Sequence, residues 1–79
     1  MKIEDIPTAT FNLISDELVA AGWKVIEEYD GFDAWIDYGL LVLSKDGVNI
    51  RMEWDNWMEG IIEGPDHLVG PIRLWHGLK

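Results

Sequence analysis

The feature that most constrains the fold is a pair of Asp-Gly dipeptides, Asp30-Gly31 and Asp46-Gly47, each set between segments in which apolar and polar residues alternate. Asp-Gly favours the two-residue turn of a β-hairpin, because both turn residues must adopt positive φ. The alternating segments are 23–29 and 32–38 around the first dipeptide, and 40–45 and 48–54 around the second. The pattern predicts two antiparallel hairpins, with a bulge or tight bend at Gly39 between them.

The segment before the hairpins has the period of a helix. Apolar residues recur at spacings of three and four, at Phe11, Ile14, Leu18 and Ala21. Thr8, which follows a proline, is the expected N-cap, and Gly22 is the expected left-handed residue just past the helix end. Trp23 would then fold back onto Leu18, a contact that often accompanies this kind of helix end.

The last third of the chain predicts less regular structure. Residues 60–64, GIIEG, suit a short further strand, and Pro71 suits the first position of a short helix that includes Ile72 and Trp75. The whole pattern predicts one α+β domain over residues 1–79. We expect an N-terminal helix packed on an antiparallel β-meander of three to four strands, followed by a short C-terminal helix or an irregular tail.

Size and composition narrow the class of protein. Seventy-nine residues make one small domain, and 48% hydrophobic residues suffice for a single core. The chain has no cysteine, which excludes disulfides and thiolate metal sites and is typical of a reducing compartment. The longest apolar run, 40–43, is far shorter than the ~20 residues of a membrane-spanning helix. The first residues carry acids where a secretory signal would carry bases, so we expect a cytoplasmic protein.

The charge is strongly acidic and unevenly distributed. Fifteen Asp and Glu residues face six Lys and Arg residues, which gives a net charge of −9. Ten of the fifteen acids lie in two segments without any base, 25–44 and 52–72. Binding to phosphate backbones or to anionic lipid requires clusters of basic residues. We therefore expect neither direct nucleic-acid binding nor membrane binding.

Part of the first alternating region superficially matches a calcium-binding loop. Glu28, Asp30, Gly31 and Asp37 fall on the third, fifth, sixth and twelfth positions of the twelve-residue EF-hand loop. Ile26 would occupy the first position, which must supply an oxygen, and the flanking residues alternate as in strands. A hairpin turn with solvated carboxylates is the preferred interpretation, with a weak, nonspecific divalent-ion site as the alternative.

Other catalytic or metal-binding groups are sparse. His67 and His76 lie nine residues apart across a proline, whereas a zinc site needs about three or four converging ligands. Ser15 and Ser44 are the only serines, and neither lies in a nucleophile-elbow sequence. We expect no metal site and no nucleophilic catalysis.

A pair of carboxylates is the remaining candidate for catalysis. Glu53 and Asp55, two positions apart on a predicted strand, would share one face at roughly 7 Å. Acid–base catalysis needs one carboxylate desolvated while its partner stays ionised, and nothing in the sequence indicates that asymmetry. We expect a protein that is not an enzyme and that needs no cofactor.

The chain is rich in tryptophan, with five residues. Trp23 and Trp54 are expected in the core, and Trp75 is expected to pack the C-terminal helix onto the sheet. Trp35 is expected to face away from the helix, and Trp57 to be exposed after the last clear strand. Such tryptophans either close the open end of a small core or act as interface anchors.

These features predict a non-enzymatic, acidic protein-binding domain. Its carboxylates would replace phosphates and engage a basic surface of a partner protein, including a nucleic-acid-binding surface. A phage-type inhibitor, an immunity protein or a nucleic-acid mimic would act in this way. The predicted partner-binding residues are Asp33, Trp35, Asp37, Glu53, Asp55, Trp57, Glu59 and Glu63.

Two alternatives stay open from the sequence. In the first, Trp35, Trp57 and Met58 form the contact of a homo-oligomer, and the protein is a self-associating structural or accessory domain. In the second, surface carboxylates bind a small ligand or a divalent metal, or catalyse a reaction.

Overall fold

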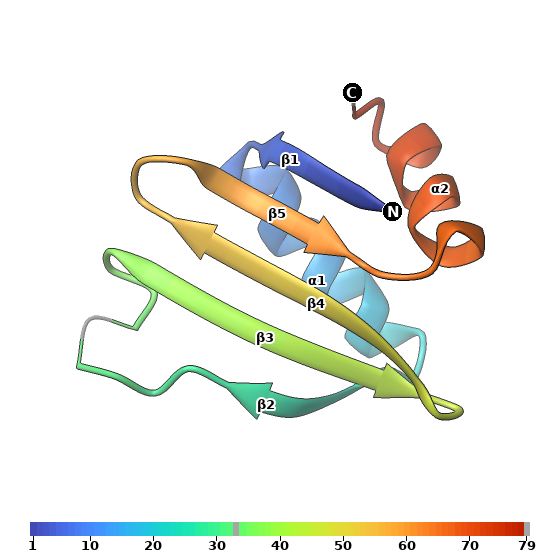
Figure 1. Cartoon of the computed structure of the whole chain (residues 1–79), viewed down its shortest axis with the longest axis horizontal. Coiled ribbons are helices and arrows are strands. Elements are labelled where there is room, and N and C mark those ends of the chain that lie inside the picture. The colour runs from blue at the N-terminus through green and yellow to red at the C-terminus, as the bar shows by residue number, and fades with distance from the viewer. Residues whose placement is uncertain (33, 79) are drawn as a thin grey trace.

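A computed structural model describes residues 1–32 and 34–78 of the chain. In chain order the elements are β1 (Lys2–Ile6), α1 (Thr8–Ala20), β2 (Lys24–Glu28), β3 (Tyr38–Lys45), β4 (Val48–Asp55), β5 (Glu59–Glu63) and α2 (Asp66–Trp75). The strands form one sheet in the order β1-β5-β4-β3-β2, and each neighbouring pair is antiparallel (Figure 1). The predicted α+β class, with an N-terminal helix, an antiparallel sheet and a short C-terminal helix, is confirmed.

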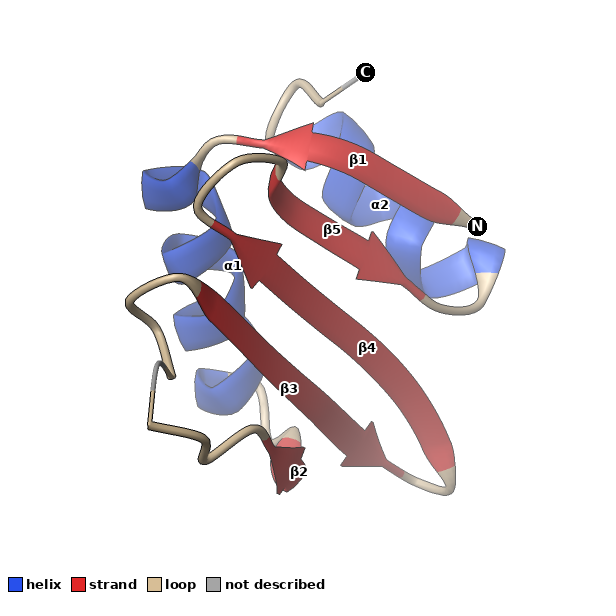
Figure 2. Cartoon of the chain, turned by 60° about the vertical axis from the view of Figure 1, so that its left-hand side comes forward, coloured by secondary structure: helices blue, strands red, loops and turns tan. Residues whose placement is uncertain are grey.

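The protein has two layers, because both helices lie on the same side of the sheet (Figure 2). Apolar side chains from the helices and from one face of the sheet form a single core. Its fully buried members are Ile3, Ile6, Phe11, Ile14, Leu43, Ile50, Met52, Ile62 and Val69. The opposite face of the sheet, the open face, is covered by no helix in the described part of the chain.

The second predicted hairpin is confirmed. Asp46 and Gly47 have φ values of 53° and 79°, so both turn residues are left-handed, as the two-residue turn requires. The turn joins β3 to β4, and Lys45 pairs with Val48 on either side of it. Because paired residues share a face, this register decides which side chains of both strands reach the core.

The first predicted hairpin is wrong. The described residues between β2 and β3, 29–32 and 34–37, form no strand, and β2 pairs directly with β3. Trp35 is left-handed, with φ of 60°, and its ring lies over Gly39, where an added Cβ would be 2.1 Å from a ring carbon. Gly39 is therefore no bend: it is a strand residue that leaves room for an indole on the core side. The irregularity lies in β2, between Val25 and Glu27.

The sequence pattern did not reveal the first strand. β1 pairs with β5, and both Ile3 and Ile6 are fully buried although they are three residues apart. The register shifts between these two residues, and Asp5 has a positive φ of 57°. Such a bulge breaks the period of two, and so the usual strand pattern is absent here.

The end of α1 follows the prediction, while both helix starts differ from it. Gly22 is left-handed, with φ of 98°, and the Trp23 N–H donates to the Leu18 carbonyl at 3.0 Å. The N-cap is Pro7 instead of Thr8, whose hydroxyl oxygen accepts a hydrogen bond from Trp54 Nε1. Helix α2 begins directly after Pro65, so Pro71 lies inside that helix and not at its first position.

Candidate protein-binding face

The open face carries acidic side chains interleaved with apolar ones. In register across three strands, Leu40 pairs with Glu53, which pairs with Ile61. Directly paired residues place their side chains on the same face. The same alternation gives the open face these further residues of β3, β4 and β5: Tyr38, Val42, Arg51, Asp55, Glu59 and Glu63. Four of the eight predicted partner-binding residues thus share one surface.

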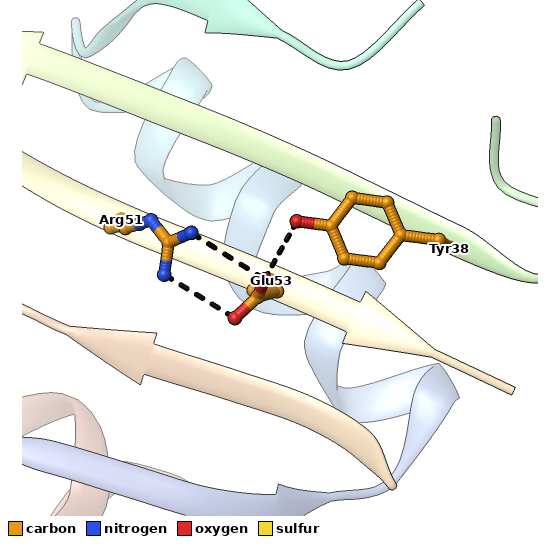
Figure 3. Close-up of polar contacts among 3 residues, drawn as sticks. All are labelled: Tyr38, Arg51 and Glu53. Atoms are coloured by element: carbon orange, nitrogen blue, oxygen red, sulfur yellow. Dashed lines mark hydrogen bonds and ion pairs between the residues drawn. The ribbon is translucent and has the colours of Figure 1, made fainter. Parts of the chain in front are cut away.

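Glu53 is held at the centre of this face by two neighbours (Figure 3). The Tyr38 hydroxyl donates to Glu53 Oε2 at 2.6 Å, and Arg51 Nη1 lies 3.3 Å from Glu53 Oε1. The hydrogen bond to Glu53, together with burial and the nearby negative charge, raises the pKa of Tyr38 to about 12. The phenol therefore stays a neutral donor at physiological pH and fixes the position of the carboxylate.

Asp55 shapes the turn between β4 and β5. Its Oδ1 accepts hydrogen bonds from the backbone N–H groups of Trp57, at 2.8 Å, and of Met58. This local bond is the kind by which Asp stabilises tight turns. Trp57 is 76% exposed at the tip of that turn, as the sequence predicted, and Met58 is exposed beside it. The turn presents an indole at the end of the acidic face.

Glu59 and Glu63 have different surroundings. Glu59 stands directly opposite Asp55 in the β4–β5 register, an unfavourable pairing of like charges. Glu63 stands between bases, in register with Arg51 on one side and Lys2 on the other. The uncompensated negative charge is therefore concentrated at the Trp57 end of the face.

Two of the three remaining predicted residues, Trp35 and Asp37, do not join this surface. Trp35 lies on the helix side, where its ring centroid is 6.1 Å from that of Phe11 and its Nε1 donates to Glu28 at 3.0 Å. The expectation that it faces away from the helix is wrong, because Gly39 opens a place for it there. The carbonyl of Asp37 accepts from Asn56 in the loop before β3, and Asp33 lies outside the described residues.

The other tryptophans divide into core and surface. Trp23 is buried, and Trp54 is partly buried, with its Nε1 donating to Thr8 Oγ1 at 3.0 Å. Trp75 is 81% exposed, so the prediction that it packs α2 onto the sheet is wrong. Val69 is the buried residue of α2, and Leu78 beyond the helix packs against the core, whereas Trp75 lies outside it.

No arrangement for metal binding is found in residues 1–32 and 34–78, where no three His, Asp or Glu side chains converge. His67 is exposed, whereas His76 Nε2 lies 2.7 Å from Glu17 Oε1. The residues that sequence reasoning missed are Tyr38, Leu40, Val42, Arg51 and Ile61 of the open face. The alternation of apolar and polar residues along each strand could have indicated them. It shows which residues share a face only once the strand register is known.

Neither described helix is both long and apolar enough to cross a membrane. Comparison with known proteins finds no family model that matches the chain, no similar curated protein and no similar solved structure.

Proposed function

We propose that the protein is a non-enzymatic binding domain whose open face, together with Trp57, engages a basic surface of another protein. The observation that carries the proposal is the pairing of Asp55 with Glu59 beside that exposed indole. Like charges opposite one another weaken a sheet, and a large exposed aromatic ring gains nothing in a free monomer. Both features become favourable when a basic partner covers them.

The composition of the open face supports an interface with a buried apolar core and a charged rim. Leu40, Val42 and Ile61 are only partly buried, and no described helix covers them. Interfaces bury apolar area at the centre and keep charged groups at the rim, where these groups steer the encounter. Glu53 is pre-positioned by Tyr38, so ordering that carboxylate costs little on binding.

The class of partner follows from the charge. A chain with net charge −9 repels nucleic acid and anionic lipid and attracts basic proteins, many of which bind nucleic acid themselves. An inhibitor, an immunity protein or a nucleic-acid mimic works in this way, with carboxylates in place of phosphates. We place this activity in the cytoplasm, because the cysteine-free chain needs no oxidising compartment.

Two double variants with equal charge changes test the proposal. Glu59→Gln with Glu63→Gln neutralises two exposed acids of the open face, and Asp16→Asn with Asp46→Asn neutralises two exposed acids elsewhere. The immobilised protein should retain a basic protein that modest salt releases. The first variant should slow association with that partner, and the control should behave as the wild type does. Equal binding by both variants would rule out this face.

Trp57→Ala tests the aromatic anchor separately. The ring is 76% exposed, so its removal should leave the fold intact. If the ring is buried by the partner, the variant should dissociate faster and lose about 2 kcal/mol or more of binding free energy. An oligonucleotide that competes with the protein for the same partner would identify the covered site as a nucleic-acid-binding one.

A further inference from the structure

An apolar groove lies between the two helices, on the side of the protein away from the open face. Its apolar lining consists of Ile14, Leu18, Pro71, Ile72 and Trp75. The volume is about 260 Å³, below the ~300–1,000 Å³ of pockets that take small organic ligands. A groove of this size and lining suits a single large apolar side chain better than a small-molecule ligand.

The tryptophan that forms one wall of the groove is largely exposed to solvent. Trp75 lines the groove and is nevertheless 81% exposed, and Leu74 beside it is 83% exposed. At the groove, His76 Nε2 lies 2.7 Å from Glu17 Oε1, a contact that joins the end of α2 to α1. An exposed indole thus projects next to a preformed apolar recess.

The charge around the groove is nearly balanced, unlike that of the rest of the molecule. The charged Asp, Glu, Lys and Arg residues of the two helices are Asp16, Glu17, Asp66 and Arg73. Asp66 is paired with the Met1 ammonium group at 2.9 Å, and Glu17 contacts His76. Neither Asp16 nor Arg73 lines the groove, so Glu17 is the one Asp, Glu, Lys or Arg residue in its lining. A basic partner therefore gains little here, whereas two copies of this acidic chain repel each other least on this side.

We propose that the groove takes the Trp75 side chain of a second copy of this chain, in a two-fold interface. In such an interface each copy contributes the same patch, so the projecting ring and the recess must be neighbours on one surface. Trp75 and the groove meet this condition. Helix α2 of one copy then lies beside α1 of the other.

The proposed dimer keeps both acidic open faces free. The helix layers meet, and the two open faces point outward, so one dimer can engage two basic sites on a partner. Linked sites bind far more tightly than single ones when the geometry allows both to engage. The interface is independent of the partner-binding proposal, because it uses the opposite layer of the fold.

Sedimentation equilibrium over a range of protein and salt concentrations tests the dimer. The mass should rise from 9.1 kDa toward twice that value with concentration. Added salt should strengthen the dimer, because it screens repulsion between two chains of net charge −9. Partner binding by the open face should respond to salt in the opposite way, so the two proposals fail independently. A mass that stays at one chain up to about 1 mM would overturn the dimer and leave the groove to another protein.

Two matched tryptophan variants identify the surface. Trp75→Lys should raise the dimer dissociation constant about 30-fold or more, the effect of an interface hot spot. Trp57→Lys replaces an equally exposed ring with the same change in charge and should leave the dimer intact. The reverse result, with Trp57→Lys abolishing the dimer, would overturn the proposal and place self-association at the β4–β5 turn.

Discussion

The Tyr38 hydroxyl donates a 2.6 Å hydrogen bond to Glu53 on the neighbouring strand, across the face of the sheet that no described helix covers. The bond is charge-assisted, and a phenol–carboxylate bond of this kind is stronger than a neutral one. It holds the Glu53 carboxylate in place on the open face and raises the pKa of Tyr38. Both consequences can be measured.

Tyr38 should ionise near pH 12. Replacing the other tyrosine, as in Tyr29→Phe, leaves the Tyr38 phenolate as the only tyrosine signal in a spectrophotometric titration. The hydrogen bond to Glu53 raises the pKa of Tyr38 to about 12, so Glu53→Gln in the same background should lower the midpoint toward ~10. Because the folded-state pKa is the higher one, this stabilisation is fully present below about pH 10 and is lost between pH 10 and 12. An unchanged midpoint in Glu53→Gln would show that the bond does not form.

Gly39→Ala should destabilise the protein by about 1–3 kcal/mol, because the new methyl group would enter the Trp35 ring. Chemical denaturation gives the free energy of unfolding of Gly39→Ala, Trp35→Ala and the double variant. The loss caused by the methyl group should largely disappear when the indole is already absent. Equal effects of Gly39→Ala with and without Trp35 would contradict the packing of this ring over the strand.

Glu59→Gln should leave stability within about 0.5 kcal/mol of the wild type or raise it slightly, because it removes the like-charge pair with Asp55. Ile14→Ala, which truncates a fully buried side chain, should cost ~2–5 kcal/mol in the same denaturation experiment. A strongly destabilising Glu59→Gln would mean that this carboxylate is needed for folding, and the open face would lose its functional explanation.

Sodium chloride should raise the melting temperature. The chain has net charge −9, and screening over ~8–10 Å weakens repulsion among its carboxylates. Calorimetry between low and moderate salt measures the effect, and the glutamine variants at positions 59 and 63 should show a smaller rise. A melting temperature that falls steadily with salt would show that ion pairs outweigh repulsion.

Asp66 should contribute to stability at every pH above its ordinary pKa and lose this contribution only in stronger acid. The hydrogen bond from the Met1 ammonium group, together with its positive charge, lowers the pKa of Asp66 below its ordinary value. Because the folded-state pKa is the lower one, this contribution is present above the unfolded pKa and is lost as the pH falls through the folded pKa. Urea midpoints of the wild type and Asp66→Asn should differ at neutral pH and converge in acid. A constant difference across that range would contradict the ion pair.

The sequence by itself determined those elements whose signals are local. Asp46-Gly47 specifies a turn because both residues tolerate positive φ, and Gly22 ends α1 for the same reason. The exposure of Trp57 beside dense acids was likewise predictable. The same local rule failed at Asp30-Gly31, where β2 pairs with β3 across a loop and Trp35 packs over Gly39 of β3.

Only the tertiary structure decided which residues meet. β1 joins the sheet at β5, its partner from the far end of the chain, through a bulge that conceals its period. Tyr38 reaches Glu53, and Glu59 faces Asp55, only because of the strand register. Trp75 lies outside the core, whereas Leu78 from beyond the helix packs against it. Such outcomes depend on contacts between distant segments, and a one-residue change of register would move every side chain of a strand to the other face.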